Sequence, residues 1–216
     1  PSFDASMRSV AGSELADYQS VSTELRIRQG VSSLRFGLAD IAFSGDQDRD
    51  EWFVGLDRVM HRTESCELSA GVEYQKVSHA RSIYDASVSK LMGEAVCTDG
   101  WTFQAEIGRD EAINARAGGD KSVTALTVAK SWPVKYGVLQ LAGSLAQEVD
   151  TNTYSDFLAR GAPRTLNTMR VGGVLEIPLG ANWALSSQVT HLKQTSNINL
   201  FRATSSELII SVILTQ

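Results

Sequence analysis

The chain lacks several features that would quickly assign it to a class. No apolar run of about 18 residues or more occurs, so the sequence predicts no transmembrane helix. Proline is scarce, with 4 residues, and the 2 cysteines are too few for a disulfide scaffold and lack metal-ligand spacing. Cys66 and Cys97 therefore form either one disulfide, in an extracytoplasmic protein, or two free thiols.

Basic residues are in the minority, which bears on the partners of the chain. Lys and Arg total 20 against 25 Asp and Glu, giving a net charge of -5. A nucleic-acid binder needs a basic patch to replace phosphate counterions, so we expect no nucleic-acid partner. The sequence also has no phosphate-binding glycine loop, metal-binding histidine pair or nucleophile elbow, and we expect no cofactor, no metal and no enzyme activity.

The segment from Cys66 to Gln75 has the clearest pattern in the chain. Its even-numbered residues are all apolar, whereas its odd-numbered residues include the carboxylates Glu67 and Glu73. Side chains of a strand alternate between two faces, so this segment predicts a β-strand with one apolar and one charged face. The apolar face meets either a protein core or lipid.

Similar alternation recurs along most of the chain and predicts an all-β fold. Most of the expected strands run about 9 to 13 residues, whereas soluble strands average about 5 or 6 and membrane-spanning barrel strands need about 9 to 11. Their length favours a barrel in a bilayer, although Arg58 and Lys90 then fall on the lipid-facing side, near strand ends. The alternating residues that assign each strand its two faces lie within 21–28, 34–39, 52–57, 66–75, 84–92, 101–108, 139–145, 169–177, 183–190 and 200–215, with 121–130 ambiguous.

The connections between these segments alternate in length. Short ones are predicted near 30–33, 61–65, 131–135 and 179–182, and longer polar ones at 44–50, 109–120 and 150–164. Outer-membrane barrels have short periplasmic turns, long external loops and an even number of strands. The sequence thus predicts a transmembrane antiparallel up-and-down β-barrel of about 12 strands, one domain over residues 1–216.

The start of the chain is less regular. An even strand number requires one more strand there, which residues 7–16 can supply; otherwise 1–17 is a periplasmic segment. The chain begins at Pro1 rather than Met, so we expect a mature or trimmed product.

Charged side chains gather on the polar faces of the predicted strands. In a barrel they point into the lumen, where they either line a path and set its selectivity or pair with one another and close it. The lumen-facing candidates are Glu24, Arg26, Arg28, Arg35, Asp57, Glu67, Glu73, Glu106, Arg170 and Glu176.

The tryptophans occur at predicted strand ends, on the apolar side. Tryptophan is enriched where a membrane surface meets water, so an interfacial belt is one interpretation and four ordinary core residues are the other. The candidates are Trp52, Trp101, Trp132 and Trp183.

One cluster carries residues found in lipid hydrolases of the outer membrane, which use a serine and a histidine. A histidine deprotonates a serine only within hydrogen-bond reach. His191 and Ser196 lie on opposite faces of one extended strand and meet only across a tight turn. A polar extracellular hairpin is the simpler interpretation.

The last third of the chain has a family resemblance. Ser196-Asn197-Ile198 followed by Phe201 opens a long final strand, with Tyr154, Arg164 and Arg170 upstream. This arrangement resembles the carboxyl-terminal β-barrel of surface lipoprotein assembly modifier proteins of the outer membrane. The resemblance implies a barrel that helps surface proteins or polymers cross that membrane. Such barrels end on an aromatic residue, whereas this chain ends Leu214-Thr215-Gln216.

The sequence therefore predicts a bacterial outer-membrane protein in contact with membrane lipid. Its expected role is passage across the membrane, by export, translocation or porin-like diffusion. One alternative is a filled structural barrel that binds a protein complex through its loops. Another is a soluble β-barrel or sandwich that binds a ligand, because such folds also alternate.

Overall fold

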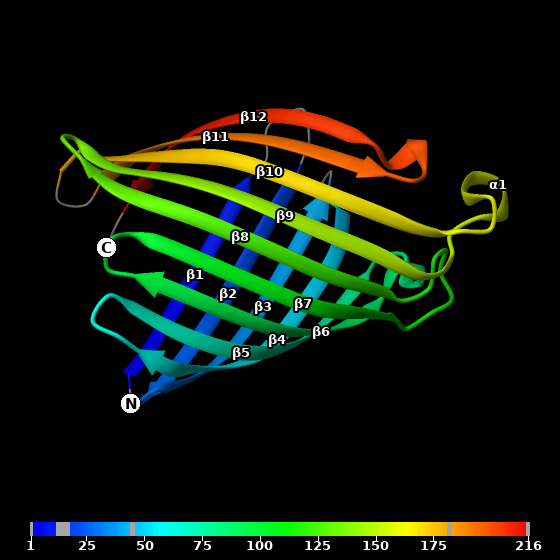
Figure 1. Ribbon diagram of the computed structural model, residues 1–216, viewed down its shortest axis with the longest axis horizontal. Coiled ribbons are helices and arrows are strands. Elements are labelled where there is room, and N and C mark those ends of the chain that lie inside the picture. The colour runs from blue at the N-terminus through cyan, green and yellow to red at the C-terminus, as the bar shows by residue number, and fades with distance from the viewer. Residues whose placement is uncertain (1, 12–17, 44–45, 181–182, 215–216) are drawn as a thin grey trace.

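Twelve antiparallel strands form one sheet in sequence order in the computed structural model of the chain (Figure 1). The structure describes residues 2–11, 18–43, 46–180 and 183–214. Every strand pairs with the next one along the chain, so the sheet is a continuous up-and-down meander. The predicted all-β, up-and-down fold of about 12 strands is confirmed.

The strands are long enough to cross a bilayer, which takes about 9 to 11 residues. Their bounds are β1 Ser2–Ala11, β2 Tyr18–Gln29, β3 Ser32–Phe43, β4 Asp46–Arg62, β5 Cys66–His79, β6 Ala86–Cys97, β7 Trp101–Ala112, β8 Lys121–Val134, β9 Gly137–Thr153, β10 Pro163–Pro178, β11 Trp183–Ser196 and β12 Ala203–Leu214. Three short helical turns lie in the connections: η1 Ser82–Tyr84, α1 Asp156–Ala159 and η2 Asn199–Phe201. Within the described ranges, no helix combines the length and hydropathy that a bilayer crossing needs.

The two ends of the sheet differ in their connections. The connections after β2, β4, β6, β8 and β10, of two to four residues, lie at one end, which we term the turn end (Figure 1). The others lie at the opposite loop end; those after β5, β7, β9 and β11 have six or more residues, whereas β3 ends at Phe43 and β4 already begins at Asp46. Ser2 pairs with Arg28 and Leu214 with Trp183, so both termini of the described sheet lie at the turn end.

Some predicted boundaries were wrong. The first strand is Ser2–Ala11 rather than 7–16, and positions 12–17 lie outside the described residues. Most of the predicted connection 44–50 is strand, because β4 begins at Asp46 and the pairing with β3 runs to Phe43. Pro133 lies within β8 opposite Val138, next to the strand end, where a missing ladder donor costs little.

Apolar side chains cover the outside of the sheet. Leu38, Ile107 and Ile210 expose 66%, 62% and 66% of their surface. Among the residues whose burial the structure describes, the buried hydrophobic side chains are Val77, Ala86, Leu166 and Ile198 alone. The residues with described burial therefore form no conventional apolar core, and the exposed apolar side chains need lipid or another apolar phase around them.

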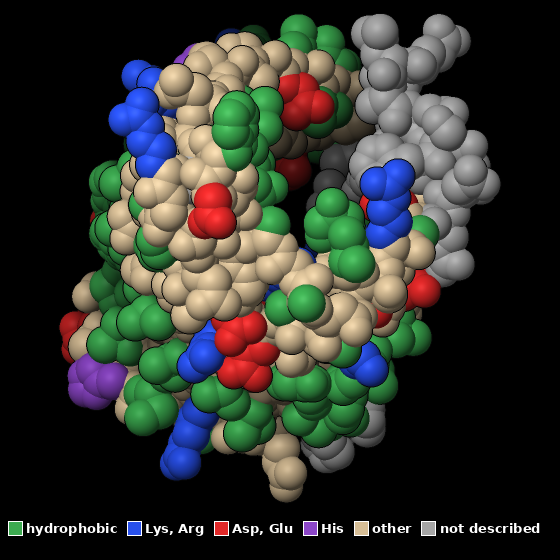
Figure 2. Space-filling model, turned by 90° about the vertical axis from the view of Figure 1, so that its right-hand side faces the viewer, with side chains coloured by type: hydrophobic (Ala, Val, Ile, Leu, Met, Phe, Trp, Pro, Cys, Tyr) green, Lys and Arg blue, Asp and Glu red, His purple; other side chains and the backbone are tan. Residues whose placement is uncertain are grey.

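The inside of the sheet is a hollow. Figure 2 looks onto the loop end and shows an opening between the strands, with acidic and basic side chains near it. In the described part of the chain no ladder joins β12 to β1, so these strands form the two edges of the sheet.

The two cysteines are the first pair of the ladder between β5 and β6. Cys66 lies directly opposite Cys97 at the turn end, and a disulfide joins them. Of the two states that the sequence left open, the structure has the cross-strand bond. It fixes the register of this hairpin at its turn.

Candidate functional site

The strand registers place every predicted lumen residue on one face of the sheet, which we term the inner face. Residues that lie directly opposite each other on neighbouring strands share a face. Arg26 lies opposite Arg35, Gly55 opposite Glu73, and Lys90 opposite Gly108, so all of them lie on the inner face. Most of the exposed apolar side chains of the strands lie on the other, outer face. On the inner face lie Glu24, Arg26, Arg28, Arg35, Asp57, Glu67, Glu73, Glu106, Arg170 and Glu176.

Four charged side chains, one on each of β3 to β6, are linked on the inner face in the order Asp57, Arg35, Glu73 and Lys90, and we term them the central ladder. Arg35 Nε lies 2.7 Å from Asp57 Oδ2, and Arg35 Nη2 lies 3.2 Å from Glu73 Oε2. Lys90 Nζ lies 3.4 Å from Glu73 Oε1. The Arg35 and Glu73 side chains are only 14% and 11% exposed, so the ladder is a partly desolvated layer of the lumen.

Glycines on the neighbouring strands make room for this ladder. Gly55 lies opposite Arg35, and a Cβ there would come within 3.1 Å of Arg35 Nη2. Gly71 lies opposite Asp57, and a Cβ there would collide with the Asp57 carboxylate. These small residues explain why long charged side chains can lie flat across a narrow interior.

Lys90 corrects the predicted orientation of its strand. The sequence placed it on the lipid side because Val88 and Met92 share its face. The register instead puts Lys90 inside, directly opposite Glu73. Arg58 lies on the outer face near the turn end, as predicted.

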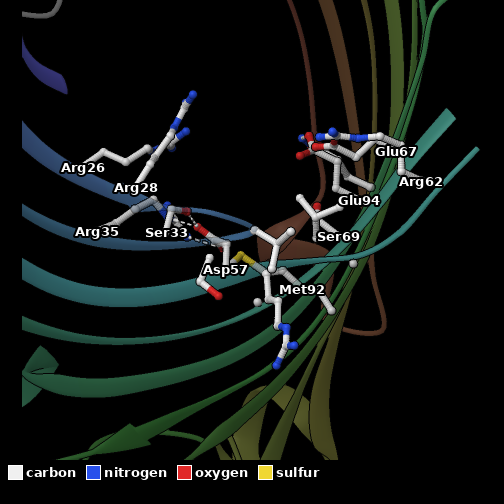
Figure 3. Close-up of a pocket in the computed structure, with 18 of the residues that line it drawn as sticks. Arg26, Arg28, Ser33, Arg35, Asp57, Arg62, Glu67, Ser69, Met92 and Glu94 are labelled. Carbon is white, nitrogen blue, oxygen red and sulfur yellow. Dashed lines mark hydrogen bonds and ion pairs between the residues drawn. The ribbon is translucent and has the colours of Figure 1, made fainter. Parts of the chain in front are cut away.

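A cavity of about 550 Å³ lies between the central ladder and the turn end. Figure 3 shows Arg26 and Arg28 on one side of it and Arg62, Glu67 and Glu94 on the other. Glu106 completes the acidic side and has no ion-pair partner within the described part of the chain. The cavity thus has a basic wall on β2 and an acidic wall on β5 to β7.

Several charged residues of the inner face were missed by the sequence analysis. Arg62 pairs with Glu67 beside the cavity, and Gln104 Nε2 donates to Glu94 Oε1 over 2.7 Å. Arg170 and Glu176, which were predicted, have no ion-pair partner among the described residues. Glu94 was missed because β6 was assigned the opposite face, and Arg62 because it follows a register shift near the end of β4.

A second group of ion pairs lies at the loop end. Arg116 pairs with Asp110, and Lys121 Nζ lies 3.9 Å from the same carboxylate. In the adjacent loop, Asp120 accepts hydrogen bonds from the backbone N–H of Ala112 and from Arg109 Nη2. These contacts, the backbone N–H first, hold the pKa of Asp120 below its ordinary value.

Most of the residues that carried the family resemblance meet in one packing cluster at the loop end, whereas Arg170 lies opposite Leu192 in the middle of β10. Arg164 lies 4.8 Å from the Tyr154 ring centre and 4.7 Å from that of Phe201. Asn197 joins the loops, since its Nδ2 donates to Pro163 O and its Oδ1 accepts from Thr165 N. Their spacing thus has a structural cause, the tying of the β9–β10 connection to the β11–β12 connection.

The four predicted interfacial tryptophans all lie on the outer face. Trp101, Trp132 and Trp183 lie close to the turn end, and Trp52 lies in the half of β4 nearer the loop end. They are 38% to 51% exposed, so they do not form a core. Lys130 Nζ lies 5.0 Å from the Trp101 ring centre, an arrangement suited to a membrane surface.

The suggested hydrolase residues are not brought together. Ser196 is buried on the inner face, where its Oγ accepts from Ile198 N, whereas His191 lies on the outer face. His191 Nδ1 instead lies 2.9 Å from Ser206 Oγ on β12. No group of three or more metal-binding side chains occurs within the described residues.

Solved structures with a similar fold include membrane proteins. OccAB3 of Acinetobacter baumannii, an outer-membrane porin, aligns with 90% of this chain at 8% identity and a TM-score of 0.56. The chain spans about half of that protein, 55% of its length. A structure from work on the in-meso crystallization of membrane proteins aligns with 99% of this chain and 83% of its own, at 12% identity and a TM-score of 0.60.

Neither a known family model nor a curated protein matches the sequence. The low identities show the fold alone, which is that of a transmembrane β-barrel of the outer-membrane type. The resemblance to surface lipoprotein assembly modifier proteins is not confirmed and stays a prediction.

Proposed function

We propose that the chain is an outer-membrane barrel through which small polar or charged solutes diffuse. The observation that carries this proposal is the cavity of about 550 Å³ between a basic wall and an acidic wall. Side chains that line a lumen set the selectivity of a pore. Opposed walls of opposite charge favour solutes that carry a charge or a large dipole.

The other half of the inner face supports a path beside the central ladder. The ladder occupies β3 to β6, whereas the inner face of β8 and β9 carries mostly small, uncharged side chains. A solute passing there would meet little steric obstruction. These residues are Ala125, Thr127, Ala129, Ala142, Ser144 and Ala146.

Conductance in planar bilayers tests this function. The folded chain is expected to give discrete channel events. Glu106→Gln removes a negative charge from the lumen, so the reversal potential measured in a salt gradient should indicate a higher permeability for anions relative to cations. Lys76→Gln is the matched control, because Lys76 is exposed on the outer face opposite Trp52 and should leave selectivity unchanged. Absence of channel events from correctly folded protein would reject the proposal.

A filled barrel that acts through its loops is the second candidate, and the central ladder favours it. Arg35, Asp57, Glu73 and Lys90 neutralise one another across four strands, which suits a plug as well as a pore wall. Its partner would be a protein complex that binds the loops, whereas the family resemblance of the last third supports export, with an exported protein or polymer as partner. Retention of a loop-binding protein by a barrel without conductance would favour the filled barrel.

We also propose that the barrel has no enzymatic activity. A hydrolase would need a base held in position by a third group and donors for the oxyanion. In the described residues, His191 has a hydrogen bond to Ser206 alone. Phospholipid incubated with folded protein should therefore release no fatty acid.

A further inference from the structure

Two rows of side chains cross the outer face of β8 to β11 near the loop end. The row nearer the loops is polar, and its two amides are joined by a bond of 2.9 Å from Gln147 Nε2 to Asn167 Oδ1. The next row toward the turn end is apolar until its last member, a lysine on β11. The polar row is Thr124, Gln147, Asn167 and Thr195, and the second row is Leu126, Leu145, Met169 and Lys193.

These two rows line a hollow of about 470 Å³ on the outside of the barrel. Beyond the hollow, toward the turn end, Gly143 is the next outer-face residue of β9 after Leu145. A Cβ at Gly143 would meet no atom within 4 Å, so the surface is open there. A groove therefore leads from a polar rim over an apolar floor into the apolar part of the outer face.

Lys193 is the positively charged residue among those that line this groove. Its side chain is exposed, and no acidic partner lies beside it in the described part of the chain. The other cation on the outer face of β8 to β12 is Lys130, which lies 3.5 Å from an Asp99 carboxylate oxygen at the turn end. Lys193 thus keeps its charge available at the boundary between polar and apolar rows.

We propose that this groove binds one molecule of an anionic phospholipid. Lys193 pairs with the phosphate, the amides of Gln147 and Asn167 hydrogen-bond the polar headgroup, and an acyl chain lies over Leu145 and Gly143. The order of polar rim, cation and apolar floor matches the order of headgroup, phosphate and acyl chain in a lipid leaflet. Van der Waals contacts between the acyl chain and the groove add a favourable term that free phosphate lacks.

Native mass spectrometry of the full chain in detergent tests the site with phosphatidylglycerol and phosphatidylcholine as probes. Phosphatidylglycerol should bind the more tightly, and Lys193→Gln should weaken it by about fivefold, as expected for one basic residue near an anionic surface. Phosphatidylcholine binding should change little. Lys76→Gln, another exposed outer-face lysine, is the matched control and should retain full affinity.

Gly143→Leu tests the acyl-chain part of the groove. It should weaken both lipids, because the new side chain fills the space that the acyl chain would occupy. Heat-modifiable migration on a gel verifies that each variant is folded. If Gly143→Leu does not fold, the Lys193→Gln variant alone still tests the proposal. Equal affinity of the two lipids, or equal loss in Lys193→Gln and Lys76→Gln, would overturn the proposal. Lipid binding is measured separately from conductance, so a negative result here would not reject the proposed function, and absence of conductance would not reject lipid binding.

Discussion

Arg164 donates two parallel hydrogen bonds to Asp150, from Nε to Oδ2 and from Nη2 to Oδ1, both over 3.0 Å. The residues are 8% and 3% exposed, and the guanidinium lies against the rings of Tyr154 and Phe201, which contact each other edge to face. The pair holds the start of β10 against the end of β9. It is the most enclosed ionic contact among the described residues.

Replacing Arg164 should therefore destabilise the barrel strongly. Arg164→Leu leaves a buried carboxylate without its partner, and breaking such a pair costs about 3 to 5 kcal/mol. Urea-induced unfolding in lipid vesicles, followed by tryptophan fluorescence, measures the loss. Arg62→Leu is the control: its pair with Glu67 is exposed, and exposed pairs contribute about 0 to 1 kcal/mol. Equal losses in the two variants would contradict this assignment.

The fold was largely predictable because alternation and strand length depend on local sequence alone. The orientation of β6 was not, because Val88 and Met92 are apolar although they face the lumen. Register was the missing information. Had Cys66 been paired with Cys97, the antiparallel ladder would have placed Lys90 directly opposite Glu73 and revealed the inner ion pair.

The cavity and the loop-end contacts were less accessible from sequence. Which inner-face charges share a wall depends on how the sheet curls, and Arg26 and Glu94 are far apart in the chain. The cluster around Arg164 depends on loop conformations that bring Tyr154 and Phe201 together. Neither kind of contact leaves a periodic signal in the sequence.

Reduction of the Cys66–Cys97 bond should lower stability without abolishing the fold. The cysteines are 31 residues apart, and closing a loop of that order stabilises a protein by about 2 to 4 kcal/mol. Cys66→Ser should match the effect of reductant in the same urea experiment, and reductant should have no further effect on the variant. Maleimide labelling of the unreduced chain would show instead that the thiols are free.

Acid should loosen the β7–β8 connection. The pKa of Asp120 is lowered from its ordinary value of 3.8, chiefly by the Ala112 N–H and then by Arg109. Its contribution to stability is therefore present above pH 3.8 and is lost as the pH falls below that value, through the folded-state pKa. A spin label at Ala115 should become more mobile over that range, and Asp120→Asn should remove most of the change. Equal acid response in both proteins would reject this role.

The edge strands lead to a prediction about closure. An unpaired backbone group in the hydrocarbon of a bilayer costs several kcal/mol, so β1 and β12 cannot both stay unpaired in a membrane. Amides of Leu208 and Ile210 on β12 should therefore exchange as slowly in lipid vesicles as those of Val171 on the interior strand β10. If the two edges of one chain pair with each other, protection will not depend on protein concentration, whereas pairing with another chain makes it rise with concentration. Fast exchange of β12 in lipid at every concentration would contradict closure.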